Sequence, residues 1–268
     1  MIFKKLHWTL KRHPFLYMSR FRLLSRNSSE AAISSISYNF FNKKEDIPRN
    51  YYDINAKIFE HVKPDTDLAV IKQLVTWLYE HTKVGPGLSE PSGRALDTML
   101  YGSGGVCSDM AQIFNNFCVI NDIQVREWGT TSAPFNRANG GHSFNEVFLK
   151  EIQKWVLIDP SWGMLFYNEQ HEPLSVIEVY QLSRRGEQVT YQSFIKGKVI
   201  ESDHVMKNYL NQDITPFLIC DYRNATYDRF LKSARPHVPV FVIHFFVFLL
   251  GKSYHYKFPL DDYRKIFS

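Results

Sequence analysis

Three residues in the middle of the chain have side chains that together could perform nucleophilic catalysis: Cys107, His142 and Asp159. A thiolate is a strong nucleophile, and the free N–H groups at a helix start lower the pKa of a cysteine placed there. A histidine can take the thiol proton and later protonate a leaving amine, while a carboxylate holds the imidazole tautomer and stabilises its charged form. The order Cys, His, Asp therefore predicts a catalytic triad, provided that the fold brings the three together.

Helical periodicity surrounds the cysteine. Apolar residues recur at helical spacing over residues 65–84, where Asp65, Thr66 or Asp67 can cap the helix start. A shorter helix is expected over 93–100, followed by a flexible Gly-Ser-Gly-Gly turn. The next helix is expected from Cys107 to about residue 120. This arrangement places the thiol at a helix N-terminus.

The period then changes from helical to extended. Residues 123–130, 142–149 and 154–159 are expected to form three strands, and Pro160 stops the last one. His142 begins the second strand and Asp159 ends the third. If these two strands are antiparallel neighbours, both side chains lie at the same end of the sheet.

Four stretches around these residues form a wider pattern. They are 104–111 (GGVCSDMA), 121–126 (NDIQVR), 141–147 (GHSFNEV) and 154–161 (KWVLIDPS). The pattern is a Gly-rich turn into a Cys-led helix, a strand that begins with His and contains an aromatic residue, and a Trp-containing strand that ends in Asp-Pro. Over roughly residues 65–165 the chain resembles the transglutaminase-like superfamily.

The resemblance implies a papain-like α+β fold, with the Cys-bearing helix packed on an antiparallel sheet and extra elements at both ends. It maps Cys107, His142 and Asp159 onto the nucleophile, the base and the group that orients the base. The implied activity is thiol-dependent acyl transfer or amide hydrolysis without a cofactor, on a peptide or another substrate with an amide or ester bond. Cys107 would attack the carbonyl, and water or an amine would resolve the acyl-thioester.

The superfamily also contains members that have lost catalysis. The alternative is therefore a catalytically silent module that binds a peptide or a glycan-linked partner. The presence of all three residue types favours the enzyme, since a silent module has no reason to keep them.

Other reactive side chains receive structural interpretations. Cys118 and Cys220 are expected to be buried small apolar residues. His142 and Glu146 have the residue types of a metal pair, but on a strand they would lie about 13 Å apart. No further Cys or His completes a zinc site, so no metal is expected. The Cys107 N–H is the natural first oxyanion donor. Tyr101 and Trp162 are the candidates for a second donor.

Charge is concentrated at the N-terminus. The chain has 268 residues, 44% of them hydrophobic, and a formal net charge of +5. Residues 1–26 carry seven Lys or Arg and no acidic residue, so the rest is close to neutral. A nucleic-acid partner is therefore not expected.

The basic segment is also rich in apolar residues. An anionic membrane surface, an extra helical layer on the domain and an organellar transit peptide remain three interpretations of it.

The remaining features concern organisation and compartment. We expect a basic amphipathic arm over 1–30, a transglutaminase-like core over 31–185 and a C-terminal extension over 186–268, with a short linker over 27–30. The apolar stretch 238–250 is shorter than the roughly 20 residues of a membrane span, so a buried strand or helix is expected. Three cysteines and no evident secretory signal favour a cytoplasmic protein. Such a protein could bind the inner face of a membrane through residues 1–26.

Overall fold

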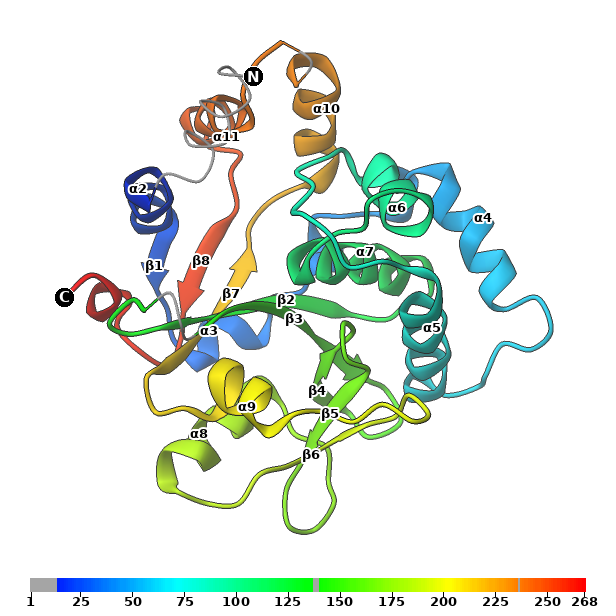
Figure 1. Ribbon diagram of the computed structural model, residues 1–268, viewed down its shortest axis with the longest axis vertical. Coiled ribbons are helices and arrows are strands. Elements are labelled where there is room, and N and C mark those ends of the chain that lie inside the picture. The colour runs from blue at the N-terminus through cyan, green and yellow to red at the C-terminus, as the bar shows by residue number, and fades with distance from the viewer. Residues whose placement is uncertain (1–13, 137–139, 236) are drawn as a thin grey trace.

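One eight-stranded sheet runs through the computed structural model, which describes residues 14–136, 140–235 and 237–268 (Figure 1). The strand order is β1-β8-β7-β2-β3-β4-β5-β6. Only β1 and β8 pair in parallel, and every other neighbouring pair is antiparallel. The strands are β1 (Ser25–Asn27), β2 (Val125–Ser132), β3 (Gly140–Leu149), β4 (Lys154–Asp159), β5 (Met164–Tyr167), β6 (Thr190–Ser193), β7 (Ile214–Cys220) and β8 (His255–Phe258).

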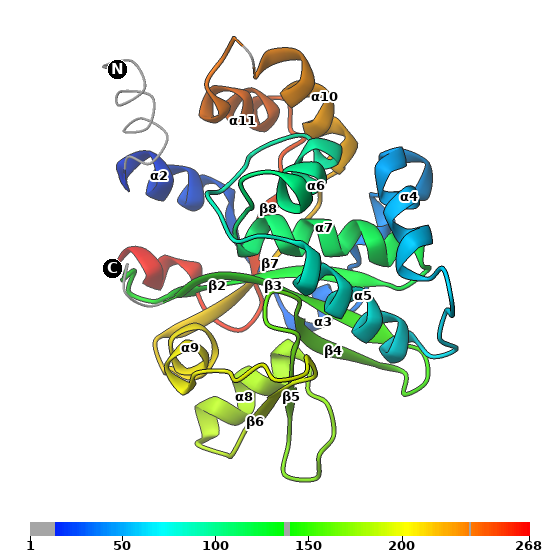
Figure 2. The same ribbon diagram turned by 45° about the vertical axis from the view of Figure 1, so that its right-hand side comes forward.

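Helices cover both faces of this sheet, as Figures 1 and 2 show. On one face the larger core joins the first set of helices to alternate residues of β2, β3 and β4, such as Val125, Val147 and Val156. This set is α4 (Arg49–Ile58), α5 (Asp67–His81), α6 (Ser92–Tyr101), α7 (Cys107–Ile120), α10 (Asn224–Ala234) and α11 (Val240–Leu249). The Cys-bearing helix α7 thus packs on a mainly antiparallel sheet, which confirms the predicted α+β fold.

The opposite face of the sheet has its own core, built around Trp128, Phe144 and Phe166. The two cores use alternate positions of the same strands because successive strand side chains point to opposite faces. The helices on this side are α3 (Glu30–Ser34), α8 (Val176–Arg185), α9 (Ser202–Val205) and the π-helix η3 (Met206–Leu210). Short 3-10 turns complete the chain at η1 (Tyr38–Phe40), η2 (Lys44–Asp46) and η4 (Tyr263–Phe267).

Local sequence patterns locate the central elements closely. The expected helix 107–120 has the bounds of α7, and the expected strand 154–159 has those of β4. The side chain of Thr66 caps α5 by accepting from the Ala69 N–H. The expected strand 123–130 lies two residues later, as β2, because α7 ends in a turn in which the Ile123 N–H bonds to the Cys118 carbonyl.

The two ends of the chain join the same sheet. Helix α2 (Pro14–Leu24) leads directly into β1, which pairs with β8. The linker expected over 27–30 is therefore wrong, since Asn27 ends a strand and the Ser29 side chain caps α3. The boundaries expected at residues 30 and 185 both fall within the span of this one sheet. Of the arm expected over residues 1–26, residues 1–13 lie outside the described residues.

The apolar stretch 238–250 forms the helix α11. Val240, Ile243 and Val247 are buried, whereas four large apolar side chains on its other side are exposed. These four are Phe245, Phe246, Leu249 and Leu250. The expectation of a buried element is thus wrong for half of the helix, because only one face of α11 packs on the domain. Among the described residues, no helix combines the length and apolar character needed to cross a bilayer.

Candidate active site

A glycine-rich turn places Cys107 at the first position of α7. Gly104 lies in the left-handed region at φ +81°, and a Cβ there would come within 2.5 Å of the Lys83 carbonyl oxygen. The Gly105 N–H donates to that same oxygen at 3.0 Å. The turn is therefore fixed against the segment that follows α5, and only glycine fits the first of these two positions.

The acidic residue in the first turn of α7 fixes the helix start. One carboxylate oxygen of Asp109, Oδ2, accepts from the Val106 N–H at 3.0 Å and from the Leu88 N–H at 3.2 Å. Its charge also complements the positive end of the helix dipole. Because Val106 uses its N–H in this way, the N–H groups of Cys107 and Ser108 are the helix-start donors without an acceptor inside the helix.

The Cys107 thiol lies in an environment that favours ionisation. Burial alone would raise its pKa. A hydrogen bond with His142, the charge of that imidazole and the Ser143 N–H outweigh burial, so the pKa of Cys107 lies below its ordinary value. Burial instead raises the pKa of both Cys118 and Cys220. All three thiols are free, and only Cys107 has an environment that favours the thiolate.

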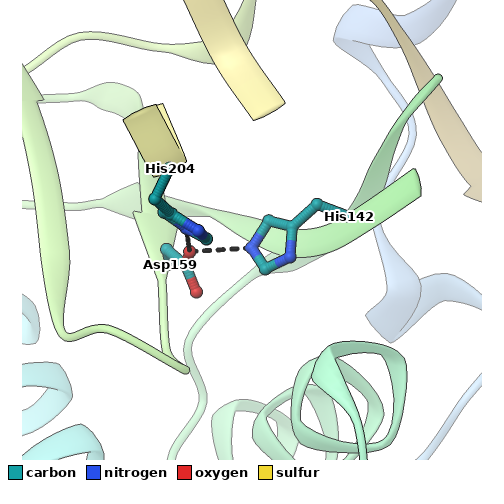
Figure 3. A group of neighbouring side chains, drawn as sticks. All are labelled: His142, Asp159 and His204. Atoms are coloured by element: carbon teal, nitrogen blue, oxygen red, sulfur yellow. Dashed lines mark hydrogen bonds and ion pairs between the residues drawn. The ribbon is translucent and has the colours of Figure 1, made fainter. Parts of the chain in front are cut away.

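Strand register brings the predicted base to the predicted carboxylate. Asn145 on β3 lies opposite Ile158 on β4, so the start of β3 and the end of β4 meet at one end of the sheet. There, His142 Nε2 lies 2.8 Å from Asp159 Oδ2, and both side chains are buried (Figure 3). With Nε2 engaged, Nδ1 is the ring nitrogen left to face Cys107. The structure therefore brings together all three residues that the sequence predicted.

Asp159 and Cys107 favour the charged form of His142. Burial lowers the pKa of the imidazole, but the charge and hydrogen bond of Asp159 and the contact with Cys107 raise it to about 10. Burial raises the pKa of Asp159, but His142, Tyr209 and His204 together hold it below its ordinary value. The arrangement thus favours a thiolate paired with an imidazolium, beside the ionised Asp159 carboxylate.

Asp159 has further donors that the sequence did not reveal. The Tyr209 hydroxyl donates to Oδ2 at 2.8 Å, and the Ser161 N–H donates to Oδ1 at 2.9 Å. Burial and the nearby carboxylate raise the pKa of Tyr209 well above its ordinary value, so it remains a donor. His204 also points its Nε2 toward Oδ2, at 4.0 Å (Figure 3).

The turn from α9, which carries His204, into the π-helix η3, which carries Tyr209, brings both side chains to the same carboxylate. A π-helix closes hydrogen bonds between residues five apart, as from the Asn211 N–H to the Met206 carbonyl at 2.9 Å. Side chains five residues apart therefore return to nearly the same face. In an α-helix, with 3.6 residues per turn, these two side chains would diverge.

Comparison with known proteins shows a family similarity over part of the chain. Residues 53–160 match the transglutaminase-like superfamily. The matched segment is less than half of the chain, and over this segment the chain is similar to that superfamily. A crystal structure of a candidate cysteine protease from Cytophaga hutchinsonii is also similar, with 17% identity and a TM-score of 0.33. The similarity covers 48% of this chain and 44% of that chain, less than half of either. No curated protein matches the chain.

One group in this transglutaminase-like site has the residue types of a metal centre. Among the described residues, His142, Asp159 and His204 alone place three candidate ligand atoms within 4.8 Å of one another. However, the Asn208 amide nitrogen lies 2.9 Å from the His204 carbonyl oxygen and 3.2 Å from its Nδ1. Only an N–H can donate to that carbonyl, so Nδ1 accepts and Nε2 carries the proton. A metal would have to displace this proton and break the bond between His142 and Asp159.

The other sequence candidates lie elsewhere. Glu146 is not a metal ligand partner of His142, because it pairs with Arg126 at 3.0 Å inside the core. Tyr101 is exposed at the end of α6, and the ring of Trp162 packs against His204 with ring centroids 4.2 Å apart. Neither Tyr101 nor Trp162 lines the cavity at Cys107. They are therefore poorly placed as oxyanion donors.

Proposed function

We propose that this protein is a thiol-dependent acyl-transfer enzyme that acts on an amide or ester bond of a peptide or related substrate. The observation that carries the proposal is the continuous series of contacts from the Cys107 thiol to His142 and from His142 Nε2 to Asp159. Buried side chains of these three types, with the thiol favoured as thiolate, are suited to nucleophilic catalysis.

In the proposed reaction the Cys107 thiolate attacks the substrate carbonyl and forms a C–S bond. His142 gives its proton to the leaving amine or alcohol as the old bond breaks, which leaves an acyl-thioester and a neutral imidazole. Water or an amine then attacks the thioester while His142 accepts its proton. The Cys107 thiolate leaves, and the original charge state is restored.

The developing oxyanion needs donors that are already in place. The N–H groups of Cys107 and Ser108 at the start of α7 are suited to this role. They belong to the helix terminus, and the helix dipole adds to their effect. We assign Asp159, Tyr209 and His204 to positioning, because they contact the imidazole or its carboxylate and not the thiol.

The proposal is tested by trapping the acyl-enzyme. The full chain is mixed with p-nitrophenyl acetate, quenched in acid, and measured by intact and peptide mass spectrometry. We expect one acetyl group on Cys107 and its absence in Cys107→Ala, while Cys118 and Cys220 stay unmodified. Release of nitrophenol without any acetyl on Cys107, equal in wild type and Cys107→Ala, would exclude the proposed mechanism.

We also propose that the protein is cytoplasmic and binds anionic membrane from that side. Support comes from the basic composition of residues 1–13 and from the exposed apolar face of α11. Basic residues add electrostatic attraction to an anionic surface, and apolar side chains insert at the boundary of the acyl chains.

A further inference from the structure

A cavity of about 560 Å³ begins at Cys107 and His142 and extends over the α7 side of the sheet. Its floor is formed by β2, β7 and β8, through residues that include Glu127 and Tyr256. Its walls come from α7, α10, α11 and α2, so both ends of the chain contribute to it. Because the proposed nucleophile opens into this space, the chemistry of the lining decides which substrates fit.

The lining has an excess of carboxylates. Four acidic residues face the cavity, against one arginine, Arg20. Two of the acids have structural tasks: Glu90 pairs with Arg235, and Asp109 holds the start of α7. The other two, Glu127 and Asp228, form no ion pair with any residue that the structure describes. Both are nonetheless buried, with 6% and 7% of their surface exposed.

Within the described residues, the hydrogen-bond donors to these two carboxylates are all neutral groups. Glu127 Oε2 accepts from Asn115 at 2.9 Å and from the Tyr222 hydroxyl at 3.2 Å, and no described residue donates to Oε1. Asp228 Oδ1 accepts from the backbone and the hydroxyl of Ser92, both at 2.9 Å. A buried carboxylate without a cationic partner is costly. Accordingly, burial raises the pKa of Glu127 to about 7 and also raises that of Asp228.

Aromatic rings line the same part of the cavity. Tyr222, Tyr227 and Tyr254 pack against one another with ring centroids 5.6 to 5.8 Å apart. The guanidinium of Arg20 already lies 5.3 Å from the centre of the Tyr254 ring, so this wall accepts a cation in the protein itself. Tyrosine faces attract cations, and the attraction increases when the cation is desolvated.

We propose that this cavity binds a positively charged group of the acyl substrate, held by Glu127 and Asp228 against the tyrosine wall. The proposal rests on the proposed function and specifies the substrate class as amides or esters whose acyl part carries an amine or quaternary ammonium. A ligand cation would supply the ion-pair partner that neither carboxylate has in the part of the chain that the structure describes.

Strand geometry sets the distance between this charge and the reacting carbonyl. Thr130 on β2 lies opposite His142, and Glu127 is three residues earlier on the same strand. Three strand residues span about 10 Å. The charged group is therefore a recognition element remote from the thioester and is not the amine that attacks it.

The binding step is tested without the reaction. In full-length Cys107→Ala, calorimetry compares two primary amides that differ at the end of the acyl chain. In one, a six-carbon chain joins the carbonyl to a trimethylammonium group, and in the other the same chain ends in an uncharged tert-butyl group. The cation should bind about tenfold more tightly than its isostere. Glu127→Gln keeps an oxygen to accept from Asn115 and Tyr222, and it should reduce that ratio to near one. Asp228→Asn should reduce the ratio in the same direction, and exposed Glu169→Gln should leave it unchanged.

Equal affinity for the cation and the isostere in Cys107→Ala would overturn the inference. So would a ratio that survives both Glu127→Gln and Asp228→Asn in proteins that retain the parent melting temperature. The p-nitrophenyl esters of the corresponding acyl groups test the other step in wild-type protein. A binding preference without any acyl group on Cys107 would refute acyl transfer but not the cation site. An acyl group on Cys107 without a charge preference would refute the cation site alone.

Discussion

The Tyr209 hydroxyl donates a 2.8 Å hydrogen bond to Asp159 Oδ2, the same oxygen that lies 2.8 Å from His142 Nε2. Tyr209 comes from the π-helix η3, well outside the segment 53–160 that matches the superfamily. The C-terminal part of the chain therefore completes the candidate site, and it also supplies part of the lining of the cavity beside Cys107.

Tyr209→Phe should reduce both stability and turnover. The change removes a donor from a fully buried carboxylate, which costs about 1 to 3 kcal/mol of unfolding free energy. It also leaves Asp159 freer to rotate away from His142. Urea unfolding and steady-state kinetics measure the two effects.

The control for this change is Tyr191→Phe. Tyr191 packs on Phe166 in the same core, and its hydroxyl has no hydrogen bond within the described residues. Equal losses of unfolding free energy and turnover in Tyr209→Phe and Tyr191→Phe would show that the Tyr209 hydroxyl does not position Asp159.

The proposed triad should act as one unit. Cys107→Ala and His142→Ala should each reduce turnover by at least about a thousandfold, and the double variant should be no worse than the worse single one. Asp159→Asn should be milder than Cys107→Ala, because an amide oxygen can still orient the ring. Circular dichroism checks that each variant is folded. If the losses of turnover add in the double variant, the two residues do not act in a shared step.

The pH profile of kcat/KM should be bell-shaped and unusually wide. Activity requires Cys107 as thiolate, so the acid limb follows its pKa, which lies below the ordinary thiol value. Activity also requires a protonated His142, so the alkaline limb follows the imidazole pKa of about 10. Activity therefore rises on the acid side as the thiol ionises and falls on the alkaline side as His142 loses its proton. A profile that begins to rise only near the pKa of a free thiol would be inconsistent with the ion pair.

Deletion of residues 1–13 should weaken binding to anionic vesicles with little effect on the melting temperature. Deleting them removes Lys4, Lys5, Lys11 and Arg12, each worth about 1 kcal/mol at such a surface, and the lost binding should be sensitive to salt. Deletion of 1–26 should in addition lower the melting temperature, because Phe21 and Leu24 are buried. Vesicle co-sedimentation with and without phosphatidylserine makes the measurement, and Phe246→Ser tests the face of α11. Salt-independent or unchanged binding after both changes would argue against a membrane role.

Local patterns were sufficient to predict the three residues of the candidate triad, but not the residues that contact Asp159 from the C-terminal part of the chain. The helix at Cys107 and the strand ending at Asp159 follow from apolar periodicity and from turn residues, which are local properties. His204 at the end of α9 and Tyr209 in the π-helix η3 reach the same carboxylate, and a spacing of five residues gives no recognised helical signal. The pairing of β1 with β8 joins segments more than two hundred residues apart, so no local pattern indicates it. In the sequence, Glu127 is an ordinary polar residue of a predicted strand. Its burial depends on the packing of α7 and Tyr222 over β2, which no local pattern indicates.

The most direct test of the account is the alkylation rate of each cysteine by iodoacetamide at neutral pH, followed by peptide mass spectrometry. Cys118 and Cys220 are internal controls, since both are buried with a raised thiol pKa. The account predicts that Cys107 reacts much faster than either control, and that His142→Ala slows Cys107 alone. Equal, slow alkylation of all three cysteines in the folded wild-type protein would contradict it.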